Sequence, residues 1–207
     1  MDGVLLDSEL AIRTACVEMF KNRGLTVTPE DFLPFTGMGE NRFIGGVAEK
    51  YGIPFEMRMK DEAYKIYGEI AKDYIIIFDG IKELIENLSK NGCKLAIASA
   101  ADSAKVNINL DCMGLNRDIF DAIITGSDVT KHKPDPQVFL MACEGIGGTP
   151  ARSVVVEDAL SGCQAAKNAK MICIGVTSTF SESELKAAGA DFVVANTPDI
   201  LEILEKL

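Results

Sequence analysis

The stretch "IKELIENLSKNGCKLAIAS", residues 81–99, decides the fold class. Its first part carries apolar residues at the spacing of an amphipathic helix, and Gly92 is typical of a helix C-terminus. Its second part, Lys94–Ser99, is short and apolar, as in a buried strand. A helix that leads directly into such a strand is the repeating unit of an α/β protein.

The same alternation continues toward the C-terminus. Further strands are predicted at Ala122–Thr125, Ser153–Val156, Met171–Val176 and Phe192–Ala195. Helices are predicted near Ser103–Met113, Pro136–Cys143, Ala159–Ala169 and Ser181–Ala188. Ser181 and Glu184 have the spacing of a capping box. Apolar strands that alternate with helices predict a parallel sheet covered on both faces.

Residues 8–74 show a different sequence pattern, in which one predicted helix follows another. Ser8 is the expected N-cap of a first helix that ends at Gly24, and Pro29 starts a second helix that Pro34 stops. Two more helices are predicted over residues 40–53 and 56–74. We therefore expect a Rossmann-like α/β core of residues 1–8 and 78–207, interrupted by an all-helical insertion over residues 9–77.

Composition limits the kinds of partner. The chain has 207 residues, enough for one core with a small inserted domain, and 21 basic against 31 acidic residues give a net charge of −10. This balance argues against nucleic acid or an anionic membrane as a partner, because both need an exposed basic face. An anionic small molecule could still bind, through local lysines or backbone amides.

The cysteines suggest a reducing compartment. They are Cys16, Cys93, Cys112, Cys143, Cys163 and Cys173. None forms a C-x-x-C pair, so reduced thiols are favoured over disulfides or a zinc site. There is no long apolar run and no charged-then-apolar leader, so we expect a cytoplasmic protein without a membrane span. A monomer is the expected state.

Polar residues follow several of the predicted strands. Ser99 ends one strand, with the amides of Ala100 and Ala101 beyond it, and Lys133 follows another. Glu157 and Asp158 stand side by side at the end of a third. Because ligands bind beyond the carboxyl ends of parallel strands, a hydroxyl, a lysine and a group of carboxylates should meet at one edge.

These residue types favour phosphoryl transfer. Carboxylates at the end of an apolar strand need a cation, and Mg²⁺ takes a few carboxylates together with water. Ser99 and Lys133 can hold a phosphate, and Asp2 suits a general acid/base. Taken singly, each residue is more often a plain loop or helix-terminus residue. Only the ordered set, one member at each strand end, outweighs that reading.

The motifs resemble those of the haloacid dehalogenase superfamily, along the whole chain. "MDGVLLDSE" looks like all but the front of the first motif, and "LAIASAADS" is similar to the second. "KHKPDPQVF" and "VVVEDALSGCQAAKNAKM" resemble the third and fourth. The helical insertion resembles the cap of the β-phosphoglucomutase-like branch, whose loop over the active site is similar to "FLPFTGMGENRFIGGVA".

The resemblance implies roles by position. Asp2 would be the acid/base and would offer its backbone carbonyl to Mg²⁺. Ser99, with the amide of Ala100, would bind the phosphoryl group. Lys133 would bridge phosphate and nucleophile. The metal ligands would be Asp158, Asp2 and Glu157, and the cap loop with Gly37 and Arg42 would touch the substrate.

The chain departs from the family pattern at its first residue. The nucleophilic aspartate of the family, on an apolar central strand, would immediately precede Met1. We expect the 207-residue chain as written to lack the usual first core strand and to be impaired as a catalyst. A truncated sequence is favoured over a genuine pseudoenzyme, because a pseudoenzyme would more simply keep the strand and replace the aspartate.

Several functions remain open. A Mg²⁺-dependent phosphatase of a small phosphorylated metabolite, acting through an aspartyl-phosphate, is favoured over a phosphosugar mutase. Ile12 stands where mutases of this branch carry a histidine. A non-catalytic sugar-phosphate sensor would bind without turnover. A phosphoacceptor receiver domain is disfavoured by the helical insertion.

Overall fold

The computed structural model describes residues 1–35 and 39–207. Contacts divide the chain into two compact units. The sheet unit contains residues 1–7, 77–100 and 113–207, and the helical unit contains residues 8–76 and 101–112. The helical unit is therefore built from two segments that interrupt the sheet unit at two places.

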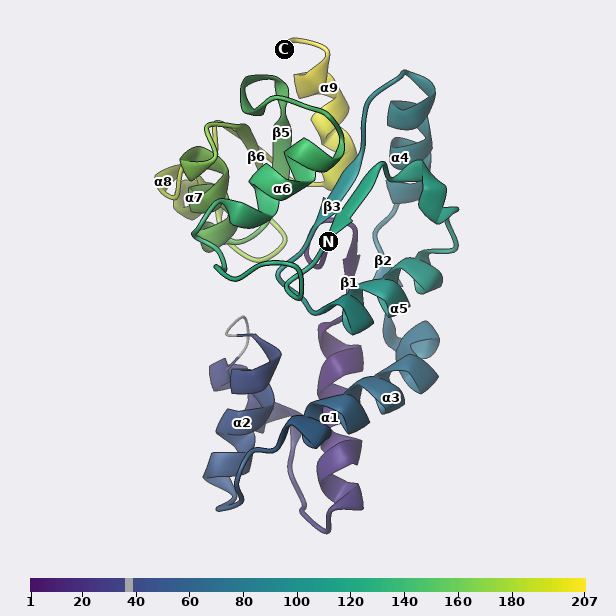
Figure 1. Ribbon diagram of the computed structural model, residues 1–207, viewed down its shortest axis with the longest axis vertical. Coiled ribbons are helices and arrows are strands. Elements are labelled where there is room, and N and C mark those ends of the chain that lie inside the picture. Colours follow the sequence, from purple (N-terminus) through teal and green to yellow (C-terminus); the bar gives the residue numbers. More distant parts are fainter. Residues whose placement is uncertain (36–38) are drawn as a thin grey trace. The chain divides into compact units, whose positions relative to one another are not determined.

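The strands of the sheet unit pair in parallel, as the alternating pattern predicted. They are β3 (Ala96–Ala98), β4 (Ala122–Ile124), β5 (Val154–Glu157), β6 (Ile172–Val176) and β7 (Phe192–Val194). Ile97 lies opposite Ile123 in the β3–β4 pair, and β5, β6 and β7 form a second parallel sheet in that order. All five predicted strands are confirmed; four are shorter than their apolar runs, and β5 has the predicted length but begins one residue later. Figure 1 labels β3, β5 and β6.

The first seven residues form a structure that the sequence did not predict. After a turn over residues 3–5, β1 (Leu6–Asp7) pairs with β2 (Ile76–Ile77) in a two-stranded sheet. The turn is held by side chains from the far end of the chain: the Thr197 hydroxyl donates to the Val4 carbonyl oxygen over 2.5 Å. Thr197 is 3% exposed, so this hydrogen bond lies inside the unit.

The helices of the sheet unit lie where they were predicted, except that the last one was not predicted. They are α4 (Ile81–Lys90), α6 (Gln137–Gly145), α7 (Leu160–Asn168), α8 (Glu182–Ala187) and α9 (Ile200–Leu204), with 3₁₀ turns η2 (Arg117–Ile119), η3 (Pro150–Arg152) and η4 (Thr197–Asp199). The capping box of Ser181 and Glu184 is present at α8. Gly92 follows α4 with a φ of +80°, a conformation that favours glycine.

The helical unit contains α1 (Glu9–Asn22), η1 (Pro29–Phe35), α2 (Glu40–Lys50), α3 (Met57–Tyr74) and α5 (Ser103–Met113). The segment from Pro29 is a 3₁₀ helix rather than an α-helix, and it runs one residue past Pro34. Proline lacks the amide that an α-helix would use, which limits this segment to short 3₁₀ turns. In the described residues, no helix is long and apolar enough to cross a membrane.

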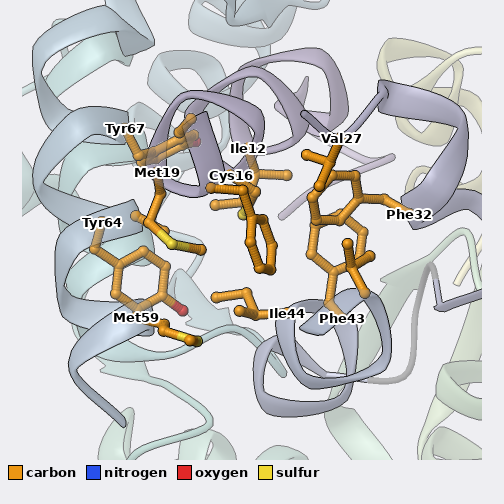
Figure 2. Packing of buried hydrophobic residues seen from close by; sticks show 14 of the residues in the cluster. Ile12, Cys16, Met19, Val27, Phe32, Phe43, Ile44, Met59, Tyr64 and Tyr67 are labelled. Atoms are coloured by element: carbon orange, nitrogen blue, oxygen red, sulfur yellow. The ribbon is translucent and has the colours of Figure 1, made fainter. Parts of the chain in front are cut away.

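Apolar side chains from α1, η1, α2 and α3 fill the core of the helical unit (Figure 2). Phe20 and Tyr67 are fully buried there, and the rings of Phe32 and Phe43 lie 4.9 Å apart. Burial of such large side chains contributes about 1.5–3 kcal/mol each. This core explains why α1 and α3 pack along each other as one body.

Helix α5 joins the helical unit although it directly follows strand β3. The Tyr67 hydroxyl donates to Oδ1 of Asn109, and the Lys60 ammonium donates to Oδ2 of Asp102 over 2.6 Å. Both contacts tie α5 and the residue before it to α3. Lys60 and Asp102 are 15% and 26% exposed, so this ion pair is only partly screened by water.

Candidate active site

Lys133 and Glu157 form an ion pair inside the sheet unit. Glu157 is the last residue of β5, and Lys133 lies on the loop before α6. The Lys133 ammonium donates to Oε1 of Glu157. Only 11% of the lysine side chain and 8% of the glutamate side chain are exposed. A pair this deeply buried is stable only when both charges are well compensated.

Backbone amides complete the surroundings of Glu157. Its Oε2 accepts hydrogen bonds from the amides of Asp158 and Ala159, each over 3.0 Å. Burial acts to raise the pKa of Glu157, but the charge of Lys133 and these donors outweigh it, so the pKa lies below its ordinary value. Glu157 is therefore an anion with both oxygens engaged.

Gly162 on α7 makes room for this carboxylate. A Cβ at Gly162 would lie 2.1 Å from Cδ of Glu157, closer than any side chain allows. The helix backbone thus lies directly against the carboxyl group. Strand β5 and helix α7 therefore meet at Glu157.

Two further contacts hold the Lys133 loop. The Lys133 ammonium lies 4.7 Å from the centre of the Phe139 ring, a cation–π distance. Nδ2 of Asn168 donates to the carbonyl oxygen of Pro134 over 2.9 Å. Lys133 is therefore held by Glu157 and by the Phe139 ring, and the next residue, Pro134, is held by Asn168.

Asp158 lies against the turn at the start of the chain. A Cβ at Gly3 would come within 2.0 Å of Oδ2 of Asp158, and Gly3 has a φ of +69°. Glycine is thus required both by the backbone conformation and by the approach of the carboxylate. Asp2, the residue before Gly3, is half-buried. This contact brings the predicted acid/base segment to the predicted metal ligand.

The charge of Asp158 is poorly compensated. Burial, and then the negative charge of Glu157, raise the pKa of Asp158, while a hydrogen bond from Thr179 opposes them.

The other predicted residues have different surroundings. Ser99, 5% exposed, follows β3 and donates its amide to the Ile124 carbonyl over 2.9 Å; Ala100 after it is exposed. Arg42 belongs to the helical unit, where it pairs with Glu49 over 3.0 Å and lies 5.1 Å from the Phe35 ring centre. Gly37 lies outside the described residues. The roles assigned to these residues stay predictions.

The oxygen donors near Asp158 decide which metal ion this region fits. Among residues 1–35 and 39–207, no group of three or more His, Cys, Asp or Glu side chains lies together in a way that could hold a metal ion. Both oxygens of Glu157 are engaged, which leaves Asp158 and the Asp2 segment as oxygen donors. Mg²⁺ needs only one or two carboxylates because it keeps several waters. The undercompensated Asp158 carboxylate fits such an ion.

Sequence reasoning missed Ser178 and Thr179. The Ser178 hydroxyl donates to the Gly3 carbonyl, and the Thr179 hydroxyl donates to Oδ2 of Asp158 over 2.6 Å. Both follow β6, so their position after a parallel strand was the available signal. Hydroxyl residues are too common in loops for that signal to single them out.

The buried Lys133–Glu157 pair lies in the sheet unit, and in the sequence the helical unit interrupts that sheet unit. Residues 1–176 match the family model of haloacid dehalogenase-like hydrolases. The chain belongs to this family, as its motifs predicted.

Three similar proteins illustrate the match. The chain is 42% identical to the Arabidopsis thaliana chloroplastic protein Suppressor of Quenching 1 over 198 residues, which are 93% of this chain but only 19% of that protein. It is 27% identical to a phosphorylated carbohydrates phosphatase of Thermotoga maritima, covering 100% of this chain and 96% of the relative. It shares the fold of β-phosphoglucomutase from Clostridium difficile, with 24% identity, a TM-score of 0.78 and coverage of 99% and 92%.

Proposed function

We propose that this protein is a Mg²⁺-dependent phosphatase that hydrolyses a small phosphorylated carbohydrate. The observation that carries this proposal is the buried Lys133–Glu157 pair, beside an Asp158 carboxylate that faces Gly3. Similarity to a phosphorylated carbohydrates phosphatase over the whole chain supports the substrate class.

The residues would divide the work. Lys133 would bind a phosphoryl oxygen while Glu157 holds it in place, because a buried ammonium with a fixed partner is a preorganised anion site. Ser99 and the Ala100 amide would bind further phosphoryl oxygens. Asp2 would protonate the leaving oxygen and then activate water. Arg42 and Gly37 would contact the carbohydrate.

Asp158 and the Asp2 backbone carbonyl would hold Mg²⁺. The ion would supply positive charge to the phosphoryl oxygens as negative charge builds up in the transition state. Lys133 contributes charge of the same sign from the protein, so loss of this lysine should slow the reaction even at saturating Mg²⁺. The aspartate that would form the aspartyl-phosphate is predicted immediately before Met1.

The test uses the protein as encoded by its gene, with whatever residues precede Met1 in the reading frame. Phosphate release is measured from a panel of hexose, pentose and triose phosphates, with Mg²⁺ or with EDTA. We expect Mg²⁺-dependent release that falls more than about a hundredfold in Lys133→Met, since one charge-stabilising group is worth that factor. Folded protein that releases no phosphate from any of these compounds would refute the phosphatase.

Two alternatives give different results in the same assay. A sugar-phosphate sensor binds a compound in isothermal titration calorimetry but releases no phosphate. A mutase converts one phosphosugar isomer to another without release. Mutases of this branch resemble one another in carrying a histidine where this chain has Ile12, which favours transfer of the phosphoryl group to water.

A cytoplasmic location and a monomeric state stay predictions.

A further inference from the structure

The loop after β6 reaches the site with two adjacent hydroxyl groups. Ser178 donates to the carbonyl oxygen of Gly3, and Thr179 donates to Oδ2 of Asp158 over 2.6 Å. These acceptors belong to separate segments, one at the start of the chain and one at the end of β5. One loop therefore bonds to both segments that carry the predicted metal donors.

We propose that Thr179 and Ser178 are positioning residues that set the Asp158 carboxylate and the Asp2–Gly3 backbone at the separation needed to bind Mg²⁺. This inference rests on the proposed function, because it concerns the same metal-dependent site. Neither residue would touch the phosphoryl group; each would act through the group that its hydroxyl binds.

The contact between Asp158 and Gly3 makes this positioning necessary. The Asp158 carboxylate lies so close to Gly3 that no Cβ fits between them. Asp158 also follows Glu157, whose charge repels it. The Thr179 hydroxyl is the side chain that donates to this carboxylate, and its hydrogen bond of 2.6 Å gives Oδ2 a fixed direction.

Ser178 acts on the other donor segment. The turn of residues 3–5 is closed by backbone hydrogen bonds, with the amides of Val4 and Leu5 donating to the Met1 carbonyl over 3.2 and 2.8 Å. The Gly3 carbonyl oxygen accepts a hydrogen bond from Ser178. This carbonyl belongs to the Gly3–Val4 peptide, which is joined through the Gly3 Cα to the peptide that carries the Asp2 carbonyl, so the hydroxyl restrains the backbone next to that carbonyl.

Neighbouring threonine provides a matched control. Thr177 lies on the same exposed loop, and its amide donates to the Val194 carbonyl over 3.1 Å, which the side chain does not affect. Thr177→Val therefore makes the same chemical change two residues from Thr179. Thr179 is exposed, so Thr179→Val should fold normally.

Mg²⁺ binding is measured by isothermal titration calorimetry on the encoded protein, with circular dichroism as a check of folding. Loss of an outer partner of a metal ligand weakens metal binding by about 10–100-fold. We expect a loss of about tenfold in Thr179→Val, recovery in Thr179→Ser, a smaller loss in Ser178→Ala and no change in Thr177→Val.

The outcomes separate the two proposals. Equal Mg²⁺ affinity in the unchanged protein and in Thr179→Val would overturn the positioning role and leave the phosphatase intact. Weakening in Thr177→Val as large as in Thr179→Val would also overturn it, because the effect would then belong to the loop as a whole. No Mg²⁺ binding by the unchanged protein would overturn the metal-dependent function and, with it, this inference.

Discussion

Replacement of Gly162 by alanine should destabilise the protein although alanine is the better helix former. Gly162 lies inside α7, and its added methyl group would lie 2.1 Å from Cδ, 2.3 Å from Oε1 and 2.5 Å from Oε2 of Glu157. The Glu157 carboxylate cannot move aside without losing a hydrogen bond, because one oxygen binds Lys133 and the other binds two amides. The substitution must therefore break at least one of these contacts.

The expected size follows from two opposing terms. Removal of a helical glycine stabilises by up to about 1 kcal/mol. Separation of one member of a buried ion pair destabilises by about 3–5 kcal/mol, since a buried charge is left uncompensated. The free energy of unfolding should fall by about 2–4 kcal/mol. Urea unfolding, followed by circular dichroism, measures this difference.

Two controls isolate the cause. Gly68 lies in α3, where a Cβ would sit 3.5 Å from Cδ1 of Ile108, an ordinary contact distance, so Gly68→Ala should stabilise by about 0.5–1 kcal/mol. In a Glu157→Ala background the obstructing atoms are gone, and Gly162→Ala should become stabilising too. A Gly162→Ala protein as stable as the unchanged one, or a loss of stability that persists without Glu157, would refute the reasoning.

Three smaller changes test other parts of the chain. Hydrogen bonds from Lys50 and other donors hold the pKa of Asp31 well below its usual range, so the stability that this carboxylate contributes is present above the unfolded pKa of about 3.9 and is lost as the pH falls. Asp31→Asn should therefore lower the free energy of unfolding by about 1–2 kcal/mol at pH 7. Urea titrations at several pH values should show the difference between the two proteins closing below about pH 4. A double-mutant cycle of Lys60→Met and Asp102→Asn should give a coupling energy of about 1–2 kcal/mol, and a value near zero would count against α5 being tied to α3 by charge. Ser181→Ala should lower the melting temperature through a loss of about 1 kcal/mol, whereas Ser181→Asp, which can still cap, should not.

Local patterns were enough to predict the strands and the capping box at Ser181, whereas Ser8 stands at the N-cap of α1 without a capping hydrogen bond from its side chain. The capping box at Ser181 depends on two residues within one turn, and the apolar run that became β5 needs no partner to be recognised. Glu157 followed from the same pattern, because a carboxylate at the end of a buried strand is unusual in itself. These features depend on neighbours in sequence.

Features that depend on distant neighbours were not predictable. The pair β1–β2 has two residues in each strand, too few to show a periodicity. Helix α5 carries apolar residues on more than one face, and only its contacts with α3 place it in the helical unit. The role of Gly162 depends on the exact approach of α7 to Glu157, since a glycine in a helix has many possible reasons.

The division of the sheet unit into three sequence segments has a consequence for the order of events on the ribosome. The Ser178–Gly3 and Thr197–Val4 hydrogen bonds span 175 and 193 residues, so the turn over residues 3–5 cannot gain these bonds until Ser178 and Thr197 have been synthesised. The helical unit has all of its residues once Cys112 has emerged. Because domains fold as units during synthesis and long loops are slow to close, a nascent chain should complete its helical unit first. A ribosome stalled just before Ser178 would carry a folded helical unit and an opening segment still without its anchors.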